Sequence, residues 1–130
     1  MDPLVGRVEL SLPPDSRYMR LARLMASGVA STCGLPLEEV EDFRIAVDEL
    51  CSTLIEMGDG EPIRLAFEIR ADVLVVEGRT LAGRAPVPDD ERFALSSQIL
   101  DVVADGHELS HLDGHVEFSA RKRVRGSGTG

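Results

Sequence analysis

The chain has 130 residues, of which 43% are hydrophobic and only 4% are aromatic, with no tryptophan. This length allows one domain, whose core must be built from aliphatic side chains. The formal net charge of −9 argues against direct binding to nucleic acid, because an acidic protein repels phosphate backbones. A basic protein partner fits this charge better, although acidity also serves solubility alone.

The cysteines and the first residues lead us to expect a cytoplasmic protein. Cys33 and Cys51 lie in helical patterns without a CxxC motif, so both are expected to be buried in a reducing compartment. The opening Met-Asp-Pro lacks the basic and apolar regions of a signal peptide. No apolar run approaches the roughly 18 residues that a membrane span needs, and we expect no membrane partner.

A strand and two helices are predicted for the N-terminal part. Residues 5–12 alternate between apolar and polar, as in a half-buried strand. Apolar residues then recur three to four apart over residues 17–32, and Asp15 or Ser16 is placed to cap this helix. A second helix is predicted to open at Pro36, because acidic residues crowd its first turns and an apolar stripe follows.

A hairpin and a loop are predicted next. Residues 63–69 and 73–76 have strand patterns, with a turn near Ala71-Asp72. Residues 78–91 are irregular and rich in glycine and proline, so we interpret them as a loop. Gly78 and Gly83 are read as loop residues rather than a phosphate cradle, because no helix is expected to start there.

The last elements complete the predicted fold. A third helix is predicted over residues 93–104, followed by strands at 108–112 and 115–124 that an Asp113-Gly114 turn joins. The glycine-rich residues 126–130 are expected to form a disordered tail. The order β-α-α-β-β-α-β-β then places three helices on one face of a mostly antiparallel, mixed sheet of about five strands, an α/β two-layer sandwich. We expect a single domain over residues 1–125, without internal repeats.

Three segments of the N-terminal half resemble a known family. They are Val8-Glu-Leu-Ser-Leu-Pro13, Arg23-Leu-Met-Ala-Ser-Gly28 and Val40-Glu-Asp-Phe-Arg-Ile-Ala-Val-Asp-Glu-Leu-Cys51. They are similar to the bacterial anti-sigma factor/serine kinase family of partner-switching regulators, within the GHKL (histidine kinase-like) ATPase superfamily. The similarity is close over about residues 7–55, holds in outline to Val76, and is weak from there to the final strands.

The resemblance implies partners, a cofactor and two site residues. It implies a domain that sequesters a sigma factor and is countered by an anti-anti-sigma protein, which the family phosphorylates on a serine. It also implies a homodimer, and ATP with magnesium bound between the second helix and the sheet. Glu49 matches the family's general base. Thr53 replaces the asparagine that binds magnesium; a threonine hydroxyl can also touch magnesium, but its reach is shorter.

The other nucleotide-binding segments of the family are altered in this chain, as in its actinobacterial members. The family's Asp-x-Gly-x-Gly falls on Thr80, Ala82 and Arg84, so the aspartate is absent and the glycines are displaced. The later Gly-x-Gly, which wraps the phosphates, falls on Ala94 and Ser96, where no glycine remains. We therefore predict that ATP binding and kinase activity are weakened or lost.

The partner-binding side of the family is better preserved. Arg23 matches the helix-one arginine that contacts both protein partners, and Arg20 lies one turn before it. The alternative is that these arginines only balance nearby acids. Three hypotheses stay open: a binding anti-sigma factor, an active ATP-dependent serine kinase, and a non-catalytic sensor or scaffold domain.

Two further clusters receive structural interpretations. His107, His111 and His115 are four residues apart, but a turn is expected between them and no cysteine or carboxylate pattern supports zinc. The basic run at residues 121–125 is interpreted as an edge-strand solubility device rather than a docking patch.

Overall fold

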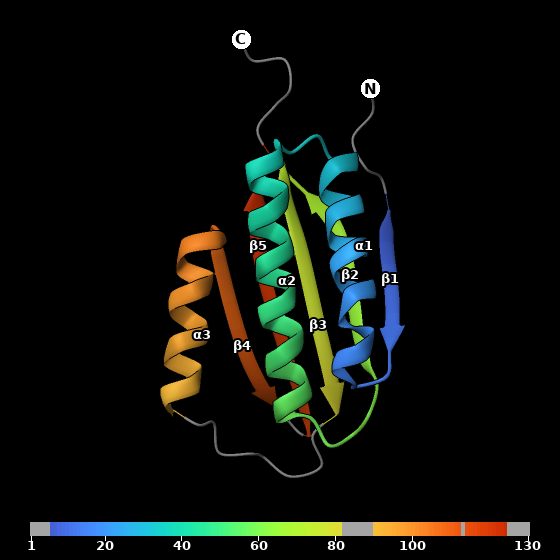
Figure 1. Cartoon of the computed structure of the whole chain (residues 1–130), viewed down its shortest axis with the longest axis vertical. Coiled ribbons are helices and arrows are strands. Elements are labelled where there is room, and N and C mark those ends of the chain that lie inside the picture. Colours follow the sequence, from blue (N-terminus) through green and yellow to red (C-terminus); the bar gives the residue numbers. More distant parts are fainter. Residues whose placement is uncertain (1–5, 82–89, 113, 125–130) are drawn as a thin grey trace.

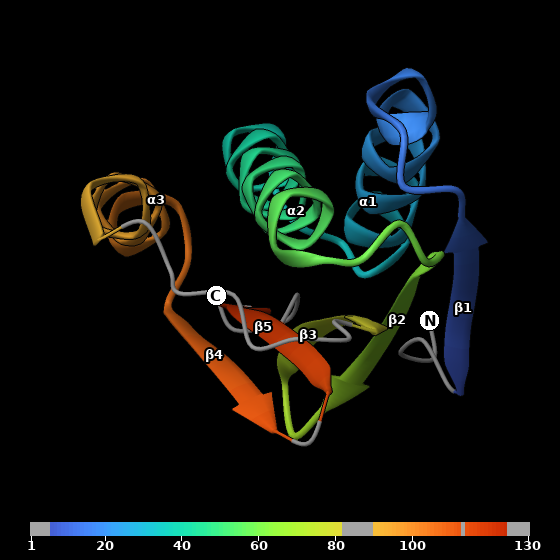
Figure 2. The same cartoon turned by 90° about the horizontal axis from the view of Figure 1, so that it is seen from below.

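The computed structural model describes residues 6–81, 90–112 and 114–124 of the chain. These residues form two layers, a five-stranded sheet and three helices that all lie on one of its faces (Figure 1 and Figure 2). The strands are β1 (Arg7–Leu12), β2 (Ile63–Arg70), β3 (Val73–Leu81), β4 (Gly106–Leu112) and β5 (His115–Arg123). The helices are α1 (Met19–Thr32), which a short 3-10 turn (Ser16–Tyr18) precedes, α2 (Leu37–Met57) and α3 (Asp90–Val103). The predicted α/β two-layer sandwich is confirmed.

The strands follow the order β1-β2-β3-β5-β4, and all neighbouring pairs are antiparallel rather than mixed. Because β5 lies inside the sheet, the interpretation of residues 121–125 as an edge-strand device is wrong. Lys122 of β5 is buried instead, and its Nζ donates a hydrogen bond of 3.3 Å to the carbonyl of Val103. The same Nζ lies 3.5 Å from the carboxylate of Asp42, so Lys122 links the sheet to both α2 and α3.

The core lies between the helices and the sheet. α2 lies between α1 and α3 over the middle of the sheet (Figure 2). Its Phe43 packs edge-on against Phe67 of β2, with ring centres 6.1 Å apart. The buried face of α1 is lined by the small residues Ala22, Ala26 and Ala30, which let the neighbouring helix approach closely. The apolar stripe predicted for α2 is confirmed.

β3 continues through Gly78 to Leu81, so the predicted loop begins too early. A Cβ at Gly78 would lie 2.5 Å from Leu50 Cδ2 and 2.7 Å from Leu54 Cδ1, both side chains of α2. The glycine therefore lets α2 pack directly on the strand, and it does not break the strand. α3 also begins earlier than predicted, at Asp90. Gly83 and the expected tail at residues 126–130 lie outside the described residues.

The local turn and cap signals are confirmed where the structure describes them. Ala71 and Asp72 both have positive φ values of 47° and 66°, which a two-residue hairpin turn between β2 and β3 requires. Asp15 accepts a hydrogen bond of 2.9 Å from the backbone nitrogen of Arg17 and so caps the 3-10 turn.

The two cysteines are free and differ in burial. Cys51 is fully buried on α2, and burial raises the pKa of its thiol to about 12. Cys33 is only half-buried, which corrects the expectation of burial for both, and partial burial also raises its pKa. Within the described ranges, no helix has both the length and the apolar character that a membrane crossing requires.

Candidate functional site

Thr53 lies on the side of α2 that faces α3. It is buried, and its hydroxyl donates a hydrogen bond of 3.0 Å to the carbonyl of Glu49, one turn earlier. The same hydroxyl oxygen lies 3.4 Å from the hydroxyl oxygen of Ser96 on α3, which is also buried. The structure thus brings Thr53 and Ser96 together, although 43 residues separate them in sequence.

Glu49 lies one helical turn before Thr53, so both project toward the same side of α2. Its side chain is half-buried, and its carboxylate makes no hydrogen bond or ion pair with any residue that the structure describes. A carboxylate in this position is chemically able to accept a proton from a hydroxyl group. The position of Glu49 is therefore compatible with the role that the family resemblance implies.

Thr80 lies near the end of β3 and is buried. Its hydroxyl lies 3.2 Å from the carbonyls of both Glu61 and Pro62, and its methyl group approaches Gly58 at the end of α2. The side chain therefore joins β3 to the connection between α2 and β2. This hydrogen bonding gives Thr80 a structural role whether or not a nucleotide binds.

The remaining predicted nucleotide-site positions are only partly described. Ala94 is exposed on α3, two residues before Ser96. Ala82 and Arg84 lie outside the described residues. The structure thus gathers two of the predicted positions, Thr53 and Ser96, at the contact between α2 and α3.

Arg23 and Arg20 have different environments on α1. Arg23 donates a hydrogen bond of 2.7 Å to the carboxylate of Asp48 on α2, so part of its charge is already compensated. Arg20 is exposed and has no ion pair with any residue in the described ranges. Arg20 is therefore the more available cation of the two.

Two leucines beside Arg20 are a feature that the sequence analysis missed. Leu21 is 44% exposed and Leu24 is 64% exposed, although Leu21 and Tyr18 are among the apolar residues that recur three to four apart over residues 17–32. Tyr18 is also exposed, so the buried stripe is narrower than predicted. The signal was present in the helical spacing, because Leu21, Leu24 and Gly28 recur on one side, away from the buried alanines. We call Arg20, Leu21 and Leu24 the α1 outer face.

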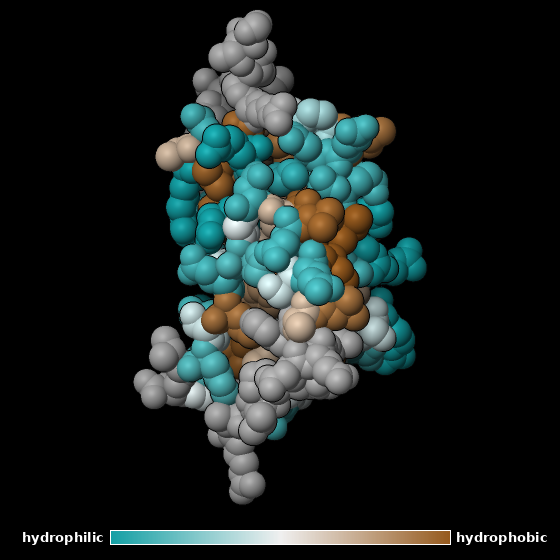
Figure 3. Space-filling model, turned by 90° about the vertical axis from the view of Figure 1, so that its left-hand side faces the viewer, coloured by the Kyte–Doolittle hydropathy of each residue, from teal (hydrophilic) through white to brown (hydrophobic). Residues whose placement is uncertain are grey.

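α3 carries a second exposed apolar surface. Leu95 and Val102 are both largely exposed, and the side of the molecule that α3 forms shows hydrophobic areas among polar ones (Figure 3). Both residues lie outside the contact that Ser96 makes with α2.

The structure separates the three histidines. His107 and His111 of β4 lie opposite Ala120 and Val116 of β5, on the face that the helices cover, whereas His115 projects from the other face. His107 Nε2 lies 2.8 Å from the carboxylate of Asp101 on α3. In the described part of the chain, no three histidine, cysteine or acidic side chains group as metal ligands.

Several curated proteins similar to this chain are serine-protein kinases named RsbW. The serine-protein kinase RsbW of Bacillus pumilus (strain SAFR-032) is 34% identical over 86 residues, which cover 59% of this chain and 53% of the relative. RsbW of Bacillus subtilis (strain 168) is 36% identical over 77 residues, covering 54% and 48%. RsbW of Halalkalibacterium halodurans is 24% identical over 127 residues, covering 84% and 78%. The chain thus spans about half the length of the first two relatives.

Two solved structures share the fold. The RsbU and RsbW domains of Rv1364c from Mycobacterium tuberculosis match with a TM-score of 0.72 and 12% identity, over 92% of this chain and 33% of that one. The SiaB–SiaC complex from Pseudomonas aeruginosa matches with a TM-score of 0.60 and 14% identity, over 90% of this chain and 89% of that one.

The family assignment rests on a longer match. The sequence profile described as "Histidine kinase-like ATPase domain" matches residues 12–105, which include α1, α2, α3 and the Thr53–Ser96 contact. Together with the RsbW relatives, this match confirms the resemblance that the N-terminal segments carry. The chain belongs to the histidine kinase-like ATPase domain family.

Proposed function

We propose that the protein is an anti-sigma factor-like regulator that acts mainly by binding. In this proposal it sequesters a sigma factor and releases it when an anti-anti-sigma protein competes for the same surface. Its relatives are named serine-protein kinases, and we propose that ATP binding and kinase activity are weakened or lost in this chain.

The observation that carries the proposal is the α1 outer face. Leu21 and Leu24 are held in water beside the uncompensated cation of Arg20. An exposed apolar pair next to an arginine has the composition of a protein-binding surface, because burying it on a partner removes apolar area from water. Arg23, fixed by Asp48 at the edge of this face, would supply a positioned donor to a partner.

The surroundings of Glu49 and Thr53 support the proposal that ATP binding is weakened. Magnesium prefers oxygen ligands in near-octahedral geometry, and the available donors here are a carboxylate at Glu49 and a hydroxyl at Thr53. The Thr53 hydroxyl already donates to a backbone carbonyl and faces Ser96 in a buried contact. A nucleotide-bound metal would have to open this contact, so the described residues do not fit magnesium-ATP as they stand. We therefore derive no phosphoryl-transfer step.

One observation favours a second candidate, an active serine kinase. The Glu49 carboxylate is half-buried and unpaired among the described residues, as a working general base would be. If this candidate is correct, the chain phosphorylates an anti-anti-sigma protein on serine, and magnesium-ATP separates α2 from α3.

A calorimetric titration with magnesium-ATP tests which candidate holds. The binding proposal expects no saturable heat up to millimolar ATP in the wild type. Micromolar binding that Glu49→Ala or Thr53→Ala abolishes would instead establish the kinase. A phosphorylation assay with radiolabelled ATP and the anti-anti-sigma homologues of the source organism adds an independent readout.

Co-purification tests the partner directly. Tagged protein is co-expressed with each sigma factor of the source organism, and we expect one to be retained until an anti-anti-sigma protein is added. Leu24→Ala and Arg20→Ala should reduce retention, whereas Leu37→Ala is a matched control, because Leu37 is 76% exposed at the distant start of α2. Retention of no sigma factor under any condition would refute the proposal. The homodimer that the family resemblance implies is measured on the same samples by light scattering.

A further inference from the structure

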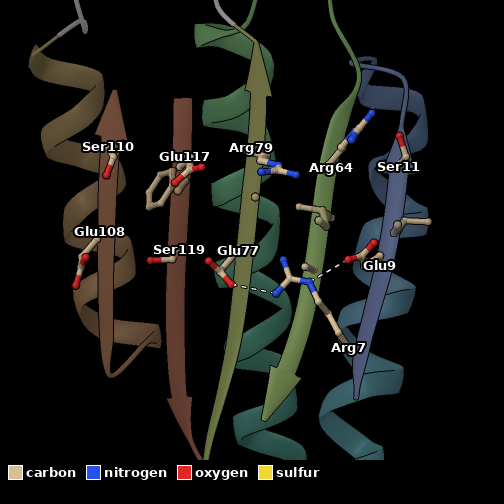
Figure 4. Close-up of a pocket in the computed structure, with 15 residues that line it drawn as sticks. Arg7, Glu9, Ser11, Arg64, Glu77, Arg79, Glu108, Ser110, Glu117 and Ser119 are labelled. Carbon is tan, nitrogen blue, oxygen red and sulfur yellow. Dashed lines mark hydrogen bonds and ion pairs between the residues drawn. The ribbon is translucent and has the colours of Figure 1, made fainter. Parts of the chain in front are cut away.

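The sheet face that carries no helix has a charged hollow. A cavity of about 520 Å³ lies over the middle of this face, and side chains from all five strands line it (Figure 4). At its centre are the small residues Ala66 of β2 and Ser119 of β5, both in register with Glu77 of β3. Long charged side chains surround these small ones, and this difference in length creates the hollow.

Several arginines on this face are paired with neighbouring glutamates. Arg7 lies 2.9 Å from Glu9 and 3.2 Å from Glu68, and Arg70 lies 2.7 Å from Glu77. These pairs form a network at one end of the face. Because both arginines of this network are already paired, neither is available to a ligand without losing those contacts.

Arg64 and Arg79 line the cavity and differ from these paired arginines. They lie directly opposite each other on β2 and β3, and both are exposed. Neither makes an ion pair with any residue in the described ranges. Like charges directly opposite in a sheet repel each other, so this pair has a cost that no described side chain relieves.

The neighbours of the pair complete a row across the sheet. Ser11 of β1 lies opposite Arg64, and Glu117 of β5 lies opposite Arg79, followed by Ser110 of β4. Glu117 is exposed and also unpaired among the described residues. In Figure 4 the Arg79 side chain extends toward β2 and that of Arg64 toward β1, so both turn away from Glu117. The row therefore has a cationic end and an anionic end.

We propose that this row binds a small phosphate monoester that carries an amine. Two arginines provide forked donors and two positive charges for a dianionic phosphate. The Glu117 carboxylate takes the ammonium group, and the Ser11 hydroxyl is placed to add a hydrogen bond to the phosphate. The cavity volume is within the range of small-molecule sites. The site lies on the opposite face of the sheet from α1 and Thr53, so it is independent of the sigma-factor proposal.

The number of charges distinguishes a free metabolite from a lipid headgroup. A phosphate monoester carries up to two negative charges near neutral pH, whereas the diester of a phospholipid carries one. Since the pair offers two guanidinium groups, the monoester should bind more tightly.

The test is a titration of the labelled full chain followed by amide NMR, with O-phosphoethanolamine, inorganic phosphate and the diester glycerophosphoethanolamine as probes. We expect saturable shifts at Ser11, Arg64, Arg79 and Glu117, with the monoester binding more tightly than the diester. Arg64→Gln and Arg79→Gln should each lower the affinity for O-phosphoethanolamine by about tenfold, as expected for loss of a charge-assisted hydrogen bond. Arg70→Gln is the control, because Arg70 lies on the same face within the neutralised network, and it should bind like the wild type. Glu117→Gln should weaken the binding of O-phosphoethanolamine but not that of inorganic phosphate.

Several results would overturn the proposal. They are the absence of saturable shifts with O-phosphoethanolamine and phosphate, equal weakening by Arg70→Gln, equal affinity for the diester, or shifts centred on Thr53 and Ser96. Circular dichroism verifies that each variant is folded. Arg79→Lys, which keeps the charge and loses the fork, should bind with intermediate affinity, and wild-type affinity in this variant would also contradict the site.

Discussion

The hydroxyl groups of Thr53 and Ser96 lie 3.4 Å apart across the contact between α2 and α3. Both positions belong to segments that hold magnesium or phosphate in the family that the sequence resembles. In this chain they are buried against each other, and Thr53 is also bonded to its own helix. The contact therefore joins α2 to α3 through two buried hydroxyl groups.

Replacing Thr53 by valine should destabilise the fold by about 1 kcal/mol, because the buried Ser96 hydroxyl then loses the Thr53 hydroxyl as its hydrogen-bonding partner. Ser96→Ala should cost a similar amount. The double variant should lose less stability than the sum of the two single losses, and the difference, the coupling energy, should be about 0.5–1 kcal/mol. Urea denaturation of the four proteins measures this cycle. Strict additivity would mean that the two hydroxyls do not interact.

Gly78→Ala should destabilise the protein by about 1–3 kcal/mol, since the new methyl group would overlap Leu50 and Leu54 in a packed core. The matched control is Gly28→Ala on α1, where nothing lies within 4 Å of the added carbon. Alanine is the better helix former, so the control should gain about 0.5–1 kcal/mol. Thermal unfolding of both variants decides the matter, and a neutral Gly78→Ala would show that α2 can move away from β3 without loss.

The thiol of Cys51 should make stability depend on alkaline pH. Burial raises its pKa from 9.0 to about 12, so the folded chain holds this proton more tightly than the unfolded chain. The resulting stabilisation is complete below pH 9 and is lost as the pH rises toward 12, at about 1.4 kcal/mol per pH unit. Urea denaturation at pH 8 and pH 10 should show this fall in the wild type. Cys51→Ala should show a smaller fall, and equal slopes would contradict the assignment.

The sequence predicted the elements well because their signals are local. The acidic start and apolar stripe of α2 identified that helix, and the short connection at Ala71-Asp72 identified the β2–β3 hairpin. Errors arose where a distant partner decides the outcome. Gly78 has the composition of a loop residue, and only the packing of α2 on β3 explains why the strand continues through it.

Local sequence patterns also could not predict the order of the strands or the exposure of individual side chains. No local pattern reveals that β5 inserts between β3 and β4, so the burial of Lys122 could not be foreseen. Leu21 fits an apolar stripe, yet the small alanines of α1 already fill the contact with its neighbours. At the site, the resemblance supplied Thr53 and Ser96 separately. Their contact became visible only when α3 was placed beside α2.

Removing one member of the unpaired arginine pair should stabilise the free protein. In phosphate-free buffer of low ionic strength, Arg64→Gln should raise the free energy of unfolding by about 0.2–1 kcal/mol, because it removes the repulsion from Arg79 directly opposite. Arg70→Gln, which breaks ion pairs with Glu68 and Glu77, should leave stability unchanged or lower it by up to about 1 kcal/mol. Both effects should shrink in 1 M sodium chloride, since salt screens exposed charges. If Arg64→Gln instead lowers stability at low salt, then the two guanidinium groups do not repel each other in the folded chain.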